Sequence, residues 1–306
     1  MNEDLRQEFD THLALIEEEE RARGSSAEQA RHNARARFGN ALAYRERALD
    51  AVIATWLDYF DTTGLDAVDY LVGDPVSTPL GGPQRFSESV VRIDPCRLCY
   101  APPDYAPAAA APPCVRNGHV TFGSFNRIPK LAPPVIALWS RILDAVPGSR
   151  LVLKNAALVD ARTRERLLGL FGEHGVGRER IELRADSPHA DMLGEYGDID
   201  IALDPFPYNG GLTTCEALWM GVPVLALMGG SMISRQSASL LAAAGLDDWI
   251  ASDEDDLIRR AVRWSRDTAS LAALRPGMRE RLLASPLLDA RGFALRFGEA
   301  LAAMAT

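Results

Sequence analysis

The chain has 306 residues, of which 47% are hydrophobic and 25% are charged, a balance typical of globular proteins with one or two domains. Its net charge of -9 and isoelectric point near 5.2 argue against a nucleic-acid surface as the main partner, because phosphate backbones require clustered positive charge. The N-terminus lacks the basic start and apolar stretch of a secretory signal, and the uncharged run at 217–234 is broken by proline and glycines. We therefore expect a cytoplasmic protein without a membrane span.

Residues 1–48 predict a helical hairpin. Apolar residues recur at helical spacing over residues 3 to 22, and Gly24 follows. Ser25 with Glu28 forms a capping box for a second helix that we expect to end near Phe38. The SSAEQARHNARARFGN ending resembles the short helical prefix found ahead of some bacterial ABC-type permeases, which implies an appendage for interaction or regulation.

Residues 49–115 form a second segment. An apolar stretch from Ala51 and the run Ser89–Ile93 predict strands, and the Pro/Ala-rich residues 100–114 indicate a linker, with a boundary near residue 115. Cys96 and Cys99 form a CxxC, but a zinc site needs a second ligand pair, which the sequence does not clearly supply. We therefore assign no metal site.

In residues 116–306, short apolar runs alternate with helical patterns. This alternation predicts a Rossmann-like parallel sheet with helices on both faces. Strands are expected at 120–125, 151–153, 181–183, 201–203 and 222–227, and helices from 133, at 161–173, 188–196, from 212 or 213, and at 234–244. Neither a GxGxxG after a strand nor a GxxxxGK[ST] is present, which weakens dehydrogenase and NTPase interpretations.

The turn between the strands at 201–203 and 222–227 is the best candidate for a ligand site. Gly210 and Gly211 let the backbone approach a ligand, and the following helix start offers free N–H groups, a combination that favours phosphate. Thr213 and Thr214 add hydroxyl donors, and Glu216 offers an acceptor for sugar hydroxyls. We therefore expect a nucleoside diphosphate here; the alternative is a turn that only packs a helix on the sheet.

Lysine use is unusual. Lys130 and Lys154 are the only lysines, and both fall just after predicted strands, Lys130 in the loop beyond the first of them, where open α/β sheets bind their ligands. An ammonium that reaches a phosphate is the functional interpretation, and two ordinary surface lysines are the alternative.

Three segments, FGSFNRIPKLAPPVIALWSRILDAVPGSRLVLK, IDIALDPFPYNGGLTTCEALWMGVPVLAL and SRQSASLL, resemble the C-terminal catalytic lobe of the O-GlcNAc transferase/SPINDLY family. Two earlier segments, WLDYFDTTGLDAVDYLVGDP and VVRIDPCRLCYAPP, resemble the end of that family's N-terminal lobe. The resemblance implies an α/β fold of the GT-B type. It consists of a Rossmann-like C-terminal lobe at 116–306, an incomplete N-terminal lobe at 49–115 and the helical hairpin.

The family transfers N-acetylglucosamine from UDP-GlcNAc to Ser or Thr of proteins with inversion and without a metal or cofactor, and some plant members use GDP-fucose. The resemblance therefore implies a nucleotide sugar and a protein acceptor as partners. It implies that Lys130 neutralises the leaving diphosphate, that Arg127 contacts the nucleotide, that His189 lies near the uracil and that Glu216 contacts the ribose. It assigns the diphosphate to Asn209, Gly210, Gly211, Thr213 and Thr214.

The chain also departs from the family pattern. Leu212 stands where the family usually has a hydroxyl residue, and no 34-residue helical repeat for acceptor binding is found. Asp198 and Asp200 spell the DxD metal motif of another glycosyltransferase fold, but beside a buried strand we expect a structural role. Either self-association or a partner supplies the missing lobe, or the chain is an impaired nucleotide-sugar-binding module. The sequence identifies neither the acceptor nor the general base.

Overall fold

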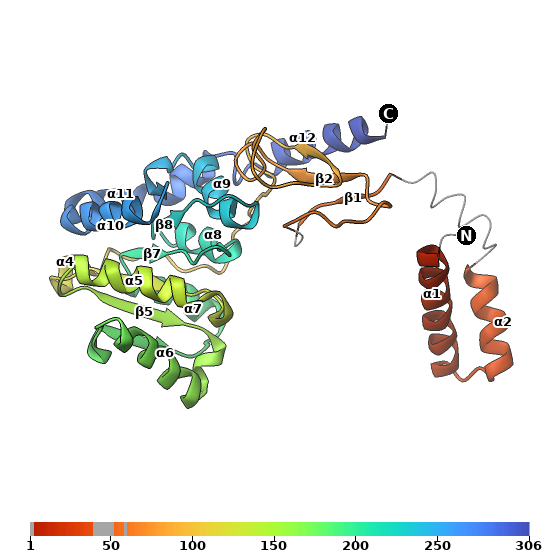
Figure 1. The fold of residues 1–306 in the computed structure, drawn as a ribbon, viewed down its shortest axis with the longest axis horizontal. Helices are drawn as coiled ribbons and strands as arrows, with labels where there is room; N and C mark the ends of the chain where they lie inside the picture. Colours follow the sequence, from red (N-terminus) through yellow and green to blue (C-terminus); the bar gives the residue numbers. More distant parts are fainter. Residues whose placement is uncertain (1–2, 39–51, 58–59, 306) are drawn as a thin grey trace. The chain divides into compact units, whose positions relative to one another are not determined.

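The computed structural model describes residues 3–38, 52–57 and 60–305, and it divides the chain into two compact units, Met1–Ile53 and Ala54–Thr306 (Figure 1). The first unit contains helices α1 (Glu3–Ala22) and α2 (Ala27–Phe38), as the sequence predicts. The helix cap differs from the prediction, because Ser26 and not Ser25 precedes α2 and accepts the Gln29 N–H at 3.3 Å. Residues 39–48 of the predicted prefix lie outside the described residues.

The second unit is organised around a six-stranded parallel sheet. Its strands are β4 (Thr121–Ser124), β5 (Arg150–Lys154), β6 (Ile181–Arg184), β7 (Ile201–Leu203), β8 (Val224–Leu227) and β9 (Ile250–Ala251). Their order in the sheet is β6-β5-β4-β7-β8-β9, which is 3-2-1-4-5-6 in chain order. The direction of winding reverses between β4 and β7, and ligands of such sheets bind in the crevice at this reversal.

Helices cover both faces of this sheet, as right-handed crossovers require. The helices are α4 (Cys114–Asn117), α5 (Pro133–Ala145), α6 (Ala161–Glu173), α7 (His189–Glu195), α8 (Leu212–Trp219), α9 (Gln236–Ala243), α10 (Glu254–Arg266), α11 (Thr268–Leu283) and α12 (Ala290–Met304). Helix α5 packs between α6 and α10, while α8 packs against α11 and α9 (Figure 1). No helix within the described ranges is long and apolar enough to cross a bilayer.

The central strands are buried along their whole length, whereas β6 alternates between buried and solvent-facing residues. A strand covered on both faces needs apolar or small residues throughout, and a strand with one open face needs them only at every second position. Gly123 of β4 shows how closely the centre is packed, because a Cβ there would lie 2.5 Å from the Ile199 side chain. The core therefore sits around β4 and β7, beneath the reversal point.

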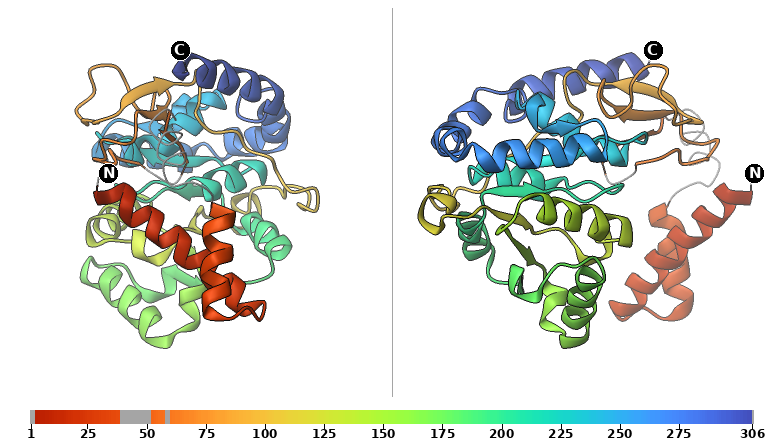
Figure 2. Two further views of the ribbon diagram at one scale, coloured as in Figure 1. Left: turned by 90° about the vertical axis from the view of Figure 1, so that its right-hand side faces the viewer. Right: turned by 60° about the vertical axis from the view of Figure 1, so that its left-hand side comes forward.

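A smaller parallel sheet precedes the large one and has the order β1-β2-β3, with β1 (Ala54–Thr55), β2 (Tyr70–Gly73) and β3 (Ser89–Arg92). Ala51, where the sequence predicts the first strand to begin, lies outside the described residues. Helix α12 lies beside this small sheet (Figure 2), and the ring centroids of Trp56 and Phe297 are 4.5 Å apart. The last helix thus shares a core with the first strands of the unit.

Candidate functional site

The candidate site lies where the sheet reverses its winding. The loop after β4 carries a 3-10 turn, Ile128–Lys130, and the loop after β7 carries the glycine turn at 204–211. Because β4 and β7 are neighbours in the sheet, residues about 80 positions apart in sequence meet at one point of its carboxyl edge.

The ammonium of Lys130 contacts the glycine turn directly. Its Nζ donates to the Asn209 carbonyl oxygen at 2.7 Å and lies 4.1 Å from the centroid of the Tyr208 ring. Burial lowers the pKa of Lys130 below its ordinary value, Arg127 lowers it further, and Asp204 opposes this shift. Since an ammonium has three hydrogens, donors remain for a ligand.

The glycine turn is closed by hydrogen bonds within itself. Gly210 donates its N–H to Asp204 Oδ1 at 2.7 Å, and the Asn209 side chain donates to the Pro205 carbonyl at 3.0 Å. A Cβ at Gly210 would lie 2.6 to 2.8 Å from side-chain oxygens of Thr214, Asp204 and Thr213. Only glycine leaves room for this close approach of side chains to the main chain.

Helix α8 begins directly after the turn and presents unused main-chain donors. The N–H groups of Thr214 and Cys215 donate to the Gly211 carbonyl, but those of Gly211, Leu212 and Thr213 have no acceptor among the described residues. Three free N–H groups at a helix start, beside an ammonium, form a site suited to a phosphate-type anion.

The two threonine hydroxyls of α8 are already engaged. Thr213 donates to Asn126 Oδ1 at 3.1 Å, and the hydroxyl oxygens of Thr214 and Ser237 are 3.0 Å apart. Leu212 is 63% exposed and carries no polar atom in its side chain. With both hydroxyls engaged in this way, the donors available to a ligand at the helix start are the main-chain N–H groups.

A second cluster lies beside the helix start. His189, the first residue of α7, places Nε2 2.8 Å from Glu216 Oε1, and its Nδ1 lies 2.8 Å from the Tyr105 hydroxyl. Glu216 is buried, and burial raises the pKa of its carboxyl above the ordinary value while His189 lowers it in part. Arg127 is exposed, and its guanidinium has no acceptor within the parts of the chain that the structure describes.

Other polar residues noted in the sequence are occupied elsewhere. Lys154 forms an ion pair with Glu195 at 2.8 Å and donates to a main-chain carbonyl. Both oxygens of Asp200 accept main-chain N–H groups, from Cys114 and Thr121, so the structure gives this carboxylate a packing role. Over the described ranges, no three His, Cys, Asp or Glu side chains are grouped as they would be to hold a metal ion.

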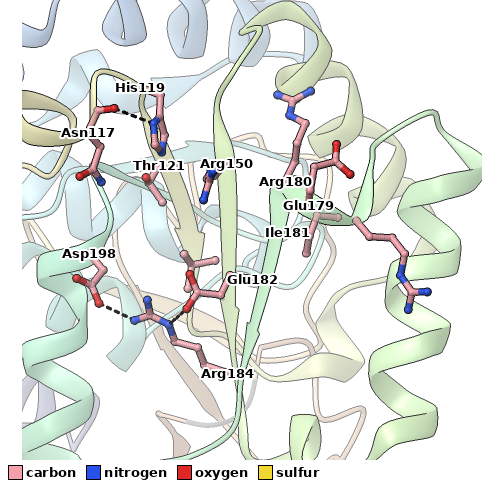
Figure 3. A pocket seen from close by; sticks show the side chains of 12 residues that line it. Asn117, His119, Thr121, Arg150, Glu179, Arg180, Ile181, Glu182, Arg184 and Asp198 are labelled. Carbon is pink, nitrogen blue, oxygen red and sulfur yellow. Dashed lines mark hydrogen bonds and ion pairs between the residues drawn. The ribbon is translucent and has the colours of Figure 1, made fainter.

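A hollow of about 660 Å³ lies elsewhere, beside the first residue of β4 and along β5 and β6 (Figure 3). Three of its charged side chains pair with one another, because Arg184 donates to both Glu182 and Asp198 at 2.7 Å. Arg180 is turned away and donates to main-chain carbonyls. We interpret this hollow as a solvated sheet face.

Sequence reasoning missed four buried polar residues around the turn, namely Asp204, Asn126, Gln236 and Ser237. Asp204 and Asn126 directly follow strands, which is a signal that could have found them. Gln236 and Ser237 reach the turn from α9, in a segment whose sequence reads only as a helix start, so tertiary structure was needed.

Comparisons with known proteins place this geometry in context. A family model described as Glycosyl transferase family 41 matches residues 113–297. A Solanum lycopersicum protein described as a probable UDP-N-acetylglucosamine–peptide N-acetylglucosaminyltransferase SPINDLY is 38% identical over 243 residues, which is 79% of this chain and 26% of that protein. The Arabidopsis thaliana protein SEC, with the same description, is 27% identical over 77% of this chain and 25% of its own length.

Among solved structures, a mutant of Thermobaculum terrenum O-GlcNAc transferase superposes with a TM-score of 0.77 and 39% sequence identity, over 83% of this chain and 48% of that one. Sucrose-phosphate synthase from Thermosynechococcus elongatus shares the fold, with a TM-score of 0.53 and 17% identity. The chain therefore has the GT-B fold expected from its sequence, and it spans about a quarter of the length of the curated relatives it matches.

Proposed function

Because the chain belongs to glycosyl transferase family 41, we propose that it binds a nucleoside diphosphate sugar at the reversal point and transfers the sugar to a hydroxyl of a protein. The donor is UDP-GlcNAc, the acceptor is Ser or Thr, and the reaction proceeds with inversion and without a metal. The contact between Lys130 and Asn209, beside the free N–H groups of α8, is the observation that carries this proposal.

The chemistry follows from the charge that develops on the leaving group. As the bond between the sugar and the diphosphate breaks, negative charge grows on the diphosphate oxygens. The Lys130 ammonium and the N–H groups of Gly211, Leu212 and Thr213 stabilise that charge, since fixed donors in a partly buried site need no reorganisation. In an inverting reaction the acceptor hydroxyl attacks from the face opposite the leaving diphosphate and loses its proton to a base.

The nucleoside part is assigned to the cluster of His189 and Glu216. With Oε1 of Glu216 bonded to His189, its second oxygen, Oε2, is left to accept a ribose hydroxyl. The Tyr105 hydroxyl bonds to Nδ1, and the Tyr105 ring meets the imidazole edge-on with an interplanar angle of 80°, so that the imidazole is held in one orientation for contact with a base. Arg127, exposed and without an acceptor in the described ranges, is proposed to contact the nucleotide.

The experiment is a donor assay on the whole protein. UDP release from UDP-GlcNAc with a Ser/Thr peptide mixture is compared between the unaltered protein, Lys130→Met and Arg178→Met. The last variant removes an equal charge from an exposed side chain that pairs with Glu165. We expect Lys130→Met to lose at least tenfold in rate and Arg178→Met to match the unaltered protein. Equal rates in all three proteins would refute the role of Lys130.

A second candidate is a binding module that holds nucleotide sugars without turnover. The observation in its favour is the small sheet β1-β2-β3, since only three strands within the described residues accompany the six-stranded sheet. Calorimetry separates the two functions: UDP binding without UDP release supports the module. If release appears only as protein concentration rises, self-association completes the acceptor side.

A further inference from the structure

The carbonyl group of Gly210 is held by two buried side chains of α9. Gln236 Nε2 donates to this oxygen at 3.1 Å, and Ser237 Oγ donates to it at 3.0 Å. Gln236 is 6% exposed and Ser237 is fully buried. Neither side chain belongs to the nucleotide site described above, and both act on the residue at its centre.

The orientation of the Gln236 amide follows from its partners. Its Oε1 accepts from Arg97 Nη2 at 2.9 Å, and a guanidinium can only donate, so Nε2 must face the Gly210 carbonyl, which can only accept. Arg97 is itself buried and reaches Gln236 from the segment between the small sheet and the linker. The amide of Gln236 is thus fixed at both ends.

The Ser237 hydroxyl has one proton, and that proton goes to the Gly210 carbonyl. In the contact of 3.0 Å between Ser237 and Thr214, the Thr214 hydroxyl must therefore be the donor. Thr214 is 2% exposed, so its hydroxyl serves the packing of α8 against α9. This assignment differs from the expectation that Thr214 donates to phosphate.

A trans peptide unit is planar, and its C=O and N–H groups point in opposite directions. With the Gly210 carbonyl held toward α9, the N–H of Gly211 points away from α9, and it is one of the three N–H groups without an acceptor in the described ranges. A Cβ at Gly211 would lie 2.7 Å from Gln236 Nε2, so Gln236 also closes the space behind this peptide.

We propose that Gln236 and Ser237 are positioning residues that aim the Gly211 N–H at the diphosphate, an inference that rests on the proposed nucleotide site. They act through the Gly210–Gly211 peptide and touch no ligand atom. Without them the peptide can rotate, and the anion loses one oriented donor. Their effect is therefore confined to ligands that carry the diphosphate.

Calorimetry on the full chain with uridine, UMP and UDP tests this inference. We expect Gln236→Leu and Ser237→Ala each to weaken UDP binding five- to tenfold, as the loss of one hydrogen-bond donor to a charged group predicts, and to leave uridine affinity unchanged. Ser239→Ala is the matched control, because Ser239 is a buried hydroxyl on the same helix that donates to Asp74 at 2.8 Å and not to the turn. We expect this control to keep the UDP-to-uridine affinity ratio.

If Gln236→Leu does not fold, Ser237→Ala gives the same readout with a smaller change. An unchanged ratio in Ser237→Ala, or an equal loss of uridine and UDP affinity, would overturn the positioning role while leaving the site itself intact. Failure of the unaltered protein to bind UDP would instead overturn the proposed function, so the two failures are distinguishable.

Discussion

The imidazole Nε2 of His189 lies 2.8 Å from Oε1 of Glu216, a carboxylate that is 3% exposed. Because the carboxylate accepts and the Tyr105 hydroxyl faces Nδ1, the imidazole carries its proton on Nε2 when Glu216 is ionised. The pair joins the start of α7 to the first turns of α8, and it stands beside the free N–H groups rather than among them. Binding of the nucleoside at this pair and binding of the diphosphate at the N–H groups can therefore be tested separately.

Glu216→Gln is expected to weaken uridine and UDP binding by the same factor, about five- to tenfold. The variant removes the charged acceptor for a ribose hydroxyl and leaves the diphosphate donors in place. Calorimetry with both ligands measures this. Tyr105→Phe serves as a milder change, since it removes only the hydroxyl on Nδ1, and a loss restricted to UDP would contradict the assignment of the nucleoside to this cluster.

The Asp204 carboxyl should make stability depend on pH. Burial raises its pKa to about 7, although the Gly210 N–H, the Ser237 hydroxyl and the charge of Lys130 oppose the shift. Between about pH 4 and pH 7 the folded state therefore holds a proton that the unfolded state has lost, and stability falls as pH rises, by about 1.4 kcal/mol per pH unit from this group alone.

Asp204→Asn keeps the acceptor for Gly210 and removes this titration. We compare the unfolding free energies of Asp204→Asn and the unaltered protein at each pH. From pH 5 to pH 7 we expect this difference to shift by about 2–3 kcal/mol in favour of the variant, because only the unaltered protein loses stability through this titration. All five tryptophans lie in the second unit, so fluorescence during urea denaturation reports on it. Asp191→Asn, an exposed carboxyl in α7, is the control and should give a constant difference.

Gly210→Ala should destabilise the protein by about 1–3 kcal/mol, because the new Cβ would meet three side-chain oxygens at 2.6 to 2.8 Å. Gly169→Ala is the matched substitution, since Gly169 lies in α6 with nothing within 4 Å of a built Cβ. For Gly169→Ala we expect the free energy of unfolding to increase by about 1 kcal/mol, because alanine has the higher helix propensity. Urea denaturation measures both, and equal effects at the two positions would argue against close packing of the turn.

Removal of divalent metals is expected to leave UDP affinity and UDP release unchanged. The DxD residues are engaged in the fold, Asp200 by two main-chain N–H groups and Asp198 by Arg184, so neither carboxylate is available to a metal-bound diphosphate. Parallel assays in EDTA and in millimolar Mg²⁺ test this. Activity that depends on Mg²⁺ would mean that these contacts break when the donor binds.

Much of the second unit could be predicted from sequence, because short apolar runs typical of buried strands alternate along the chain with the apolar spacing of amphipathic helices. The strand Ile201–Leu203 and the helix Ala161–Glu173 match the expected bounds. Strand β8 begins at Val224, two residues later than expected, because Pro223 cannot donate to the ladder. The predicted cap residue of α2 was wrong by one position. Ser25 and Ser26 have the same side chain, so the sequence did not distinguish between them.

The candidate site was predictable only in outline. Lys130 and the glycine turn follow strands that become neighbours in the sheet, and the family resemblance predicts that they bind one diphosphate. The bond between Thr214 and Ser237, and the hold of Gln236 on Gly210, depend on how α8 and α9 pack. Helix periodicity gives no information about such contacts, because side chains of two separate elements meet only in three dimensions.

The contact of Trp56 with Phe297 places the beginning and the end of the second unit beside one another. A chain whose ends meet can be joined there and reopened elsewhere without moving any strand in the sheet. The exposed turn at His174–Gly175, between α6 and β6, is a suitable opening point. A circular permutant of this kind would place the glycine turn before the small sheet and Lys130 after it, so the two halves of the site would come from opposite parts of the new chain.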